Sequence, residues 1–232
     1  MSSRSSSWRE LIVRLAAELG VIVLGVLIAL WADGWVAERA DRNVERARTD
    51  ALRENIVATR VRLDEAVEEA HSAQEALSTM AYWEDPALLN RQQDLLLRGL
   101  LFGPVFTPEI NVYIDLKNSG DLALLTSADL RQALARMDAV LEQLALLQSD
   151  VVAVQQLNFD PFVVRELALE GTLGPLLGLE DLPTVASTPD VDMQVLRNLA
   201  LFKLDLIAQL LRQYEEAGET LQGVEGAIEE IG

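Results

Sequence analysis

The chain lacks cysteine and contains one histidine, His71. The absence of thiols excludes disulfides, thiol nucleophiles and thiolate metal sites. Any Ser-His-Asp triad would have to use His71, which lies in a polar helical stretch. Glu68 and His71 have the spacing of di-iron carboxylate sites, but such sites need two of these motifs and two further glutamates, which only a homodimer could supply. We therefore expect a non-enzymatic protein with no catalytic residue, no bound metal and no cofactor.

Glycine, proline and aromatic residues are also scarce. The 232 residues include 13 glycines and 7 prolines, and aromatic residues make up 5%. Because strand patterns are nearly absent, no glycine-rich phosphate loop can follow a strand. Half of the residues are hydrophobic, which is ample for one buried core. These features predict an all-α fold in which the helices pack as a bundle.

Basic residues are few, and the chain has a formal net charge of −18. Residues 1–37 carry equal numbers of basic and acidic residues, so the whole excess of negative charge lies on residues 38–232. A domain of this charge repels nucleic acid phosphates and anionic lipid headgroups. We therefore expect no nucleic acid partner.

One long apolar run is present near the N-terminus. The stretch from Leu19 to Ala32 has no charged residue, and residues 15–37 carry only Glu18 and Asp33. The run predicts a single-pass transmembrane helix over residues 15–37, with the lipid bilayer as the first partner. Residues 1–14 then form a short cytoplasmic segment, and residues 38–232 form an acidic helical domain.

Tryptophans flank the apolar run at a spacing that fits a bilayer. Trp8 and Trp31 lie roughly 34 Å apart on an α-helix, and a hydrocarbon core is about 30 Å thick. Tryptophan favours both membrane interfaces. The alternatives are a buried core helix and a cleaved signal peptide. A signal peptide needs small residues before the cut, and Leu30-Trp31-Ala32 has bulky residues at the first two positions. We therefore favour an uncleaved anchor.

The orientation of the anchor follows from its arginines, which tend to remain in the cytoplasm. Arg4, Arg9 and Arg14 precede the span, but several arginines also follow it. We expect the N-terminus in the cytoplasm and the C-terminal domain outside it.

Small and charged residues in the anchor indicate possible contacts with other helices. Glu18 can pair with Arg14 one helical turn earlier, or it can contact another transmembrane helix. Gly25 and Ala29 have a spacing that allows close helix approach. The residues assigned to membrane anchoring and helix association are Trp8, Arg14, Glu18, Gly20, Gly25, Ala29, Trp31 and Trp35.

The remaining chain divides into helices by periodicity and by N-cap residues that precede proline. The helix of the anchor is expected to continue as a long stalk helix over 38–84. Its first part has an alanine-rich stripe at residues 37–51 that can pack against a second copy, and its second half has an apolar stripe from Leu52 to Met80. A helical corner follows over 86–120, and the terminal part after Glu215 is expected to be solvated and frayed. The predicted helices are 8–84, 86–101, 108–118, 127–157, 161–169 and 189–230, with N-caps at Asp85, Thr107, Asp160 and Thr188, and a capping box at Thr126 and Asp129. The segment 171–187 is predicted to be a loop.

The corner contains the best candidate for a binding site. Tyr113 lies on one side of a short helix that Gly120 is expected to end in a left-handed conformation. The first interpretation is a structural turn, and the alternative is a ligand or partner pocket around Tyr113, Asn118 and Ser119. The residues singled out are Phe106, Tyr113, Asn118, Ser119 and Gly120.

Three blocks of sequence resemble a bacterial family of single-pass membrane proteins known as a domain of unknown function. The first block runs from Glu18 to Leu30 and is followed by Trp35. The second begins at Phe106-Thr107-Pro108 and continues to Arg131, and the third is the leucine-rich helix from Leu196 to Tyr214. The chain departs from the family at Asp33-Gly34, where amide residues are expected. The resemblance implies a protein of the bacterial inner membrane with an α-helical periplasmic domain, and it implies no activity.

These observations predict a membrane-anchored, non-enzymatic scaffold or interaction protein that forms homo-oligomers, in part through a coiled coil. The alternative is a ligand- or partner-binding sensor module. Because only about 14 residues precede the span, a sensor would need a membrane protein partner, which Glu18 could contact.

Overall fold

The computed structural model describes residues 5–85, 87–101, 103–166, 177–178 and 191–231, with side chains described at only part of residues 5–43. Within these ranges the backbone is helical or irregular and contains no strand, so the predicted all-α class is confirmed. The chain divides into two units, Met1–Asp50 and Ala51–Gly232, and each is considered by itself.

The helix α1 spans Ser5–Met80 and carries the first unit. Across the described residues, no helix combines the length and the apolar character that crossing a membrane requires. The predicted span 15–37 includes several positions outside the residues whose side chains are described. Those positions are 15–18, 20–22, 33–34 and 36–37, and the side chain of Trp8 also lies outside them.

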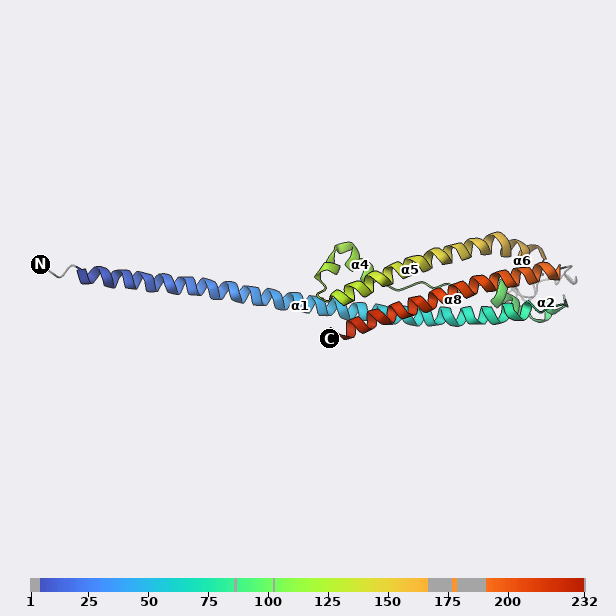
Figure 1. Ribbon diagram of the computed structural model, residues 1–232, viewed down its shortest axis with the longest axis horizontal. Coiled ribbons are helices and arrows are strands. Elements are labelled where there is room, and N and C mark those ends of the chain that lie inside the picture. Colours follow the sequence, from blue (N-terminus) through green and yellow to red (C-terminus); the bar gives the residue numbers. More distant parts are fainter. Residues whose placement is uncertain (1–4, 86, 102, 167–176, 179–190, 232) are drawn as a thin grey trace. The chain divides into compact units, whose positions relative to one another are not determined.

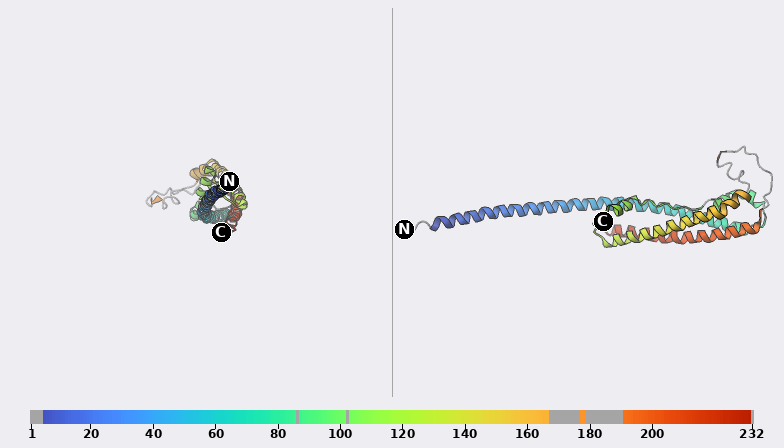
Figure 2. Two further views of the ribbon diagram at one scale, coloured as in Figure 1. Left: turned by 90° about the vertical axis from the view of Figure 1, so that its left-hand side faces the viewer. Right: turned by 90° about the horizontal axis from the view of Figure 1, so that it is seen from above.

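The second unit is built on three long helical segments that share one core: residues 51–80 of α1, α5 (Ala128–Val154) and α8 (Met193–Glu229). Figures 1 and 2 show α5 and α8 side by side. Arg60 of α1 pairs with Glu225 of α8, and Arg197 of α8 bonds to the end of α1, so these two segments are antiparallel. Gln155 contacts Lys203, whereas Gln148, which comes earlier in the chain, contacts Tyr214 further along α8, so α8 is antiparallel to α5 as well. The α1 segment and α5 therefore run in the same direction.

Two parallel segments need a return connection between them, and an irregular segment supplies it. After α1 come α2 (Leu88–Arg91), α3 (Gln93–Leu96) and a π-helical turn, η1 (Leu97–Leu101). Residues 103–110 are then non-helical and lead back to α4 (Asn111–Ser119) and the 3-10 turn η2 (Asp121–Leu124). A second π-helical turn, η3 (Gln155–Phe159), joins α5 to α6 (Asp160–Glu166). We call residues 103–110 the strap.

The core confirms the apolar stripe predicted for the second half of the long first helix. The stripe residues of α1 recur at three-, four- and seven-residue steps, and each is at least 97% buried. They are Leu52, Ile56, Leu63, Ala66, Ala70, Ala73, Leu77 and Met80. Gly99 of η1 lies against this stripe, because a Cβ there would be 3.1 Å from the Met80 sulfur.

The predicted fraying after Glu215 is wrong. Helix α8 continues to Glu229, and its apolar positions remain buried in the bundle. The buried positions after Tyr214 are Ala217, Thr220, Leu221, Val224 and Ile228. The glutamates between them occupy the other faces of the helix, so the charge count misled the prediction and the spacing of apolar residues decided the structure.

Several predicted helix starts are also wrong. Helix α4 begins at Asn111 without a side-chain cap, not at Thr107. Asp160 does not cap a new helix, because α5, η3 and α6 follow one another without a break. Ser127, rather than Thr126, caps α5 by accepting a hydrogen bond from the Leu130 amide at 3.1 Å. The predicted cap at Thr188 and most of the predicted loop 171–187 lie outside the described residues, and Asp192 is the cap of α8.

Candidate functional site

The turn that ends the short helix of the predicted corner has the expected geometry. Tyr113 and Leu116 are buried on one side of α4, and Gly120 ends the helix with φ of +80°. Ser119 donates to the Leu116 carbonyl and accepts from the Asp121 amide, each at 3.3 Å, so its hydroxyl serves the local backbone. Asn118 and Ser119 are exposed whereas Tyr113 is buried. These contacts match the structural interpretation of the corner.

Tyr113 belongs to a charged network between α4 and α5. Lys117 pairs with Asp138 at 2.5 Å and lies 3.9 Å from Glu142, and its Nζ is 5.9 Å from the centre of the Tyr113 ring. Burial and, to a smaller extent, the nearby Asp138 carboxylate raise the pKa of Tyr113 to about 12. The hydrogen bond to Asp138 likewise raises the pKa of Lys117. The network holds the corner against α5 and keeps the tyrosine protonated.

Phe106 does not belong to the corner but lies in the strap, where its ring is buried against that of Tyr214 at 6.2 Å. The side chain of Gln148 holds the strap backbone at two points. It accepts from the Phe106 amide at 2.7 Å and donates to the Phe106 carbonyl at 3.1 Å. The Tyr214 hydroxyl donates to the same Gln148 oxygen at 3.3 Å, and burial raises the pKa of Tyr214.

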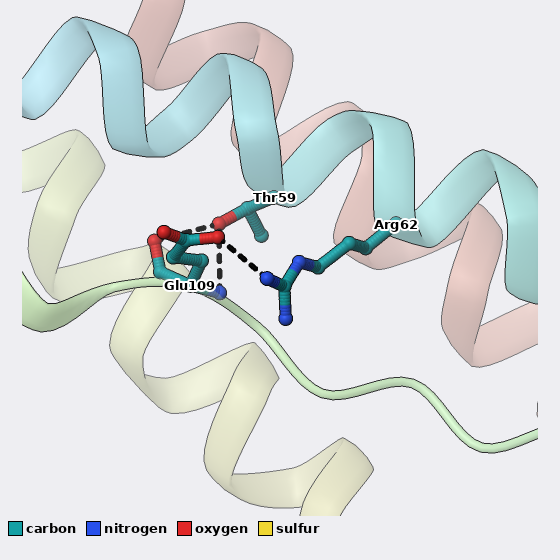
Figure 3. A network of polar contacts seen from close by, with 3 residues as sticks. All are labelled: Thr59, Arg62 and Glu109. Carbon is teal, nitrogen blue, oxygen red and sulfur yellow. Dashed lines mark hydrogen bonds and ion pairs between the residues drawn. The ribbon is translucent and has the colours of Figure 1, made fainter.

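A second side chain holds the other end of the strap in the same way (Figure 3). The buried hydroxyl of Thr59 donates to the Glu109 carbonyl at 2.9 Å and accepts from the Glu109 amide at 3.0 Å. Arg62 adds an ion pair to the Glu109 carboxylate at 2.7 Å. Gln148 and Thr59 thus supply hydrogen bonds that a neighbouring strand would supply in a sheet, which lets an extended segment lie on helices without losing them.

Replacing Gln148 with alanine is expected to lower the free energy of unfolding by about 2–4 kcal/mol, because the Phe106 amide and carbonyl lose their partners at a partly buried site. Urea unfolding of the full-length protein measures the change. Gln143→Ala, an exposed glutamine on the same helix, is the control and should cost less than about 0.5 kcal/mol. Equal stability of the two variants would show that the strap does not depend on Gln148.

Lys203, in the first third of α8, is only 2% exposed, which is unusual for a lysine. Its Nζ donates to the Leu100 carbonyl of η1 at 2.8 Å and to the Gln155 side chain of η3 at 2.7 Å. Gln155 in turn donates to the same Leu100 carbonyl and to Asp160, and the Lys203 Nζ lies 5.2 Å from the Phe159 ring centre. Burial lowers the pKa of Lys203 to about 8, although the Asp160 charge opposes the shift.

This centre joins both π-helical turns to α8, and π-helical turns are frequent at functional sites. One signal for this centre is present in the sequence, since the apolar stripe of the last helix has Phe202 and Lys203 at one of its steps. The partners Gln155 and Leu100 are far away in sequence, so periodicity alone did not bring them together. Through the Leu100 carbonyl and the Gln155 side chain, Lys203 of α8 contacts η1 and η3, so the centre holds these three segments in register.

His71 is exposed on α1. Across the described part of the chain, no three histidine, cysteine or acidic side chains gather in a way that could hold a metal ion. Among the predicted anchor residues, the side chains of Trp8, Arg14 and Glu18 lie outside the described part of the structure. The exposure of Gly20 is not described either.

The other anchor residues lie in the described part of the structure, and each of them is exposed. Trp31, Trp35 and Ala29 are exposed, and no atom lies within 4 Å of the position of a Cβ on Gly25. The guanidinium of Arg39 lies 5.3 Å from the centre of the Trp35 ring.

No protein-family model, curated protein or solved structure matches the chain. The family resemblance of the three sequence blocks therefore stays a prediction.

Proposed function

We propose that the protein is a single-pass, membrane-anchored helical scaffold that self-associates and performs no reaction. The observation that carries the proposal is the exposure of the apolar residues in the first unit. The seven large apolar side chains between Val23 and Trp31, together with Leu19, are between 50% and 73% exposed. Nine consecutive positions cover every face of a helix.

A helix that is apolar on all faces is stable only when it is surrounded by a nonpolar medium. Each large apolar side chain contributes roughly 1.5–3 kcal/mol when it leaves water, so eight of them contribute more than about 10 kcal/mol. A single partner helix would cover one face, whereas a lipid bilayer covers all of them. This argument supports a bilayer as the medium around residues 15–37.

The residues after the apolar run support the same proposal. Trp31 and Trp35 are exposed, and Arg39 lies over the ring of Trp35. Tryptophan and arginine favour the headgroup layer, where an apolar ring and a charge can both be accommodated. We propose the cytoplasmic membrane of a bacterium as the location, with the N-terminus in the cytoplasm and the acidic domain in the periplasm.

Self-association is proposed through the first unit. Val44 is 49% exposed and Ala47 is also exposed, within the alanine-rich stripe of residues 37–51. Small side chains at helical spacing allow close packing of two copies as a coiled coil, and the uncovered Gly25 and Ala29 extend the small-residue positions into the anchor.

Ala47→Arg is expected to convert the oligomer into a monomer, because a long charged side chain cannot fit between closely packed helices. Chemical cross-linking in membranes, read by gel electrophoresis, measures the loss of the oligomer band. Ala139→Arg, an exposed alanine inside α5, is the matched control and should leave the band unchanged. A band of unchanged strength in Ala47→Arg would exclude this stripe as the contact.

A ligand-binding sensor module is the second candidate function. The observation that favours it is a surface cavity of about 510 Å³ between the end of α1 and the start of α8, away from the predicted corner.

A further inference from the structure

We propose that this cavity binds small carboxylic acids with an apolar or aromatic body, with Arg197 as the anchor for the carboxylate. The proposal deepens the second candidate function and is independent of the membrane anchor. The cavity is lined by residues at the end of α1 and at the start of α8. Figure 1 shows these two helix ends at one end of the second unit.

Arg197 is half-buried in the cavity lining and is fixed by the end of α1. Its Nε donates to the Ala81 carbonyl at 3.0 Å, and one Nη donates to the Trp83 carbonyl at 3.4 Å. A guanidinium has five N–H donors, so the second Nη and one further proton remain for a ligand. The two backbone bonds orient the group before any ligand arrives, which reduces the entropy lost on binding.

Among the described residues, no carboxylate neutralises the charge of Arg197. Acidic residues outnumber basic ones 37 to 19, yet no ion pair joins Arg197 to a carboxylate in the described part of the chain. Glu84 also lines the cavity and is exposed, so it adds negative charge near the entrance without bonding to Arg197. A half-buried cation without a carboxylate partner is a site for an organic anion.

The other lining residues select the body of the ligand. Leu201, Leu204 and Ala81 give apolar walls, and Tyr82 places a ring that is 85% exposed at the rim. The exposed hydroxyl of Ser78 adds one polar contact. A volume of this size lies within the range of ligand pockets, roughly 300–1,000 Å³, and these pockets are mostly apolar with a few polar groups. An inorganic anion would leave the apolar walls unused.

The test uses 3-phenylpropionate as the probe, with 3-phenyl-1-propanol as its neutral analogue and acetate as the acid without an apolar body. Ligand-observed NMR titration is carried out on the full-length protein in nanodiscs. We expect 3-phenylpropionate to bind at least about tenfold more tightly than either analogue, since the carboxylate and the ring each contribute.

Two variants assign the binding to this cavity. Arg197→Gln should weaken binding of the acid about ten- to a hundredfold, whereas Arg212→Gln, an exposed arginine on the same helix, should change it less than about twofold. Glu84→Gln should strengthen binding about two- to fivefold, because it removes a like charge at an exposed position where folding is not at risk.

The outcomes distinguish an error in the proposed ligand class from an error in the proposed binding function. If the alcohol binds as tightly as the acid and Arg197→Gln has no effect, the proposed ligand class is wrong but a binding role survives. If no probe binds, or if Glu84→Gln weakens binding of the acid, the cavity is not an acid site. Neither result changes the proposal of a membrane-anchored scaffold.

Discussion

The double variant Leu24→Arg and Leu27→Arg is expected to appear in the soluble fraction, whereas the unaltered protein stays in the membrane after carbonate extraction. Both leucines lie in the middle of the predicted span, and each arginine there costs about 3 kcal/mol of insertion free energy. Together with the loss of two leucines, the penalty is about 6 kcal/mol or more, which exceeds what a single marginal span can tolerate.

The same experiment reports the orientation. Alkaline phosphatase fused to the C-terminus is active only outside the cytoplasm, so the unaltered fusion should be active and the double variant inactive. The matched control is Val57→Arg with Val61→Arg, two exposed valines further along the same helix, in the second unit. The control should remain in the membrane with full phosphatase activity. An unaltered protein that carbonate extracts, or a double variant that stays in the membrane, would contradict the anchor.

The stability of the second unit is expected to rise between pH 8 and pH 10. Burial lowers the pKa of Lys203 from 10.5 to about 8, so over this range the unfolded chain binds a proton that the folded protein has already released. Stability rises with pH wherever the unfolded state binds more protons, and the expected gain is about 2 kcal/mol. Above pH 10 the trend reverses, because the pKa values of the buried Tyr113 and Tyr214 are raised and the unfolded tyrosines lose their protons first.

Chemical unfolding of the full-length protein at a series of pH values measures this curve. Lys203→Met keeps the length of the side chain and removes the titrating group, so it should abolish the rise. Lys117→Met is the control: Lys117 has a raised pKa and does not titrate between pH 8 and pH 10, so this variant should keep the rise. A flat curve for the unaltered protein, or a rise that survives in Lys203→Met, would show that the lysine is not buried as described.

The helical segments could be predicted because the spacing of apolar residues within each segment is sufficient to indicate a helix. The stripe from Leu52 to Met80 has helical spacing, and every member that the pattern indicated is buried. Gly120 was predicted to take a left-handed conformation, and it does so because glycine has no Cβ that opposes it. The end of α8 was predicted incorrectly, since the charge of its glutamates was given more weight than the spacing of Ala217, Leu221 and Val224.

The strap could not be predicted from local patterns. Thr107-Pro108 has the form of a helix start, yet these residues remain extended because Thr59 and Gln148 bond to the backbone on either side of them. Those partners are more than 40 residues away in sequence. Tertiary hydrogen bonds therefore override the capping signal, and the helix begins at Asn111 instead.

The polar centre at Lys203 was also beyond the sequence pattern. A lysine within an apolar stripe normally extends its charged end to water along the helix surface. Here the π-helical turns bring the Leu100 carbonyl and the Gln155 side chain to Nζ, so the charge stays inside. Asp160 was predicted to cap a helix, and instead it accepts a hydrogen bond from Gln155 within a helix that continues.

Native mass spectrometry of the full-length protein, released from its own membrane, tests the central proposal most directly. The scaffold proposal predicts an assembly with a fixed number of identical copies, each with the mass of the uncleaved chain. That result would support an uncleaved anchor and self-association together. A single copy, or a chain shortened before the acidic domain, would contradict the proposal, and extra bound mass on a single copy would favour the ligand-binding function instead.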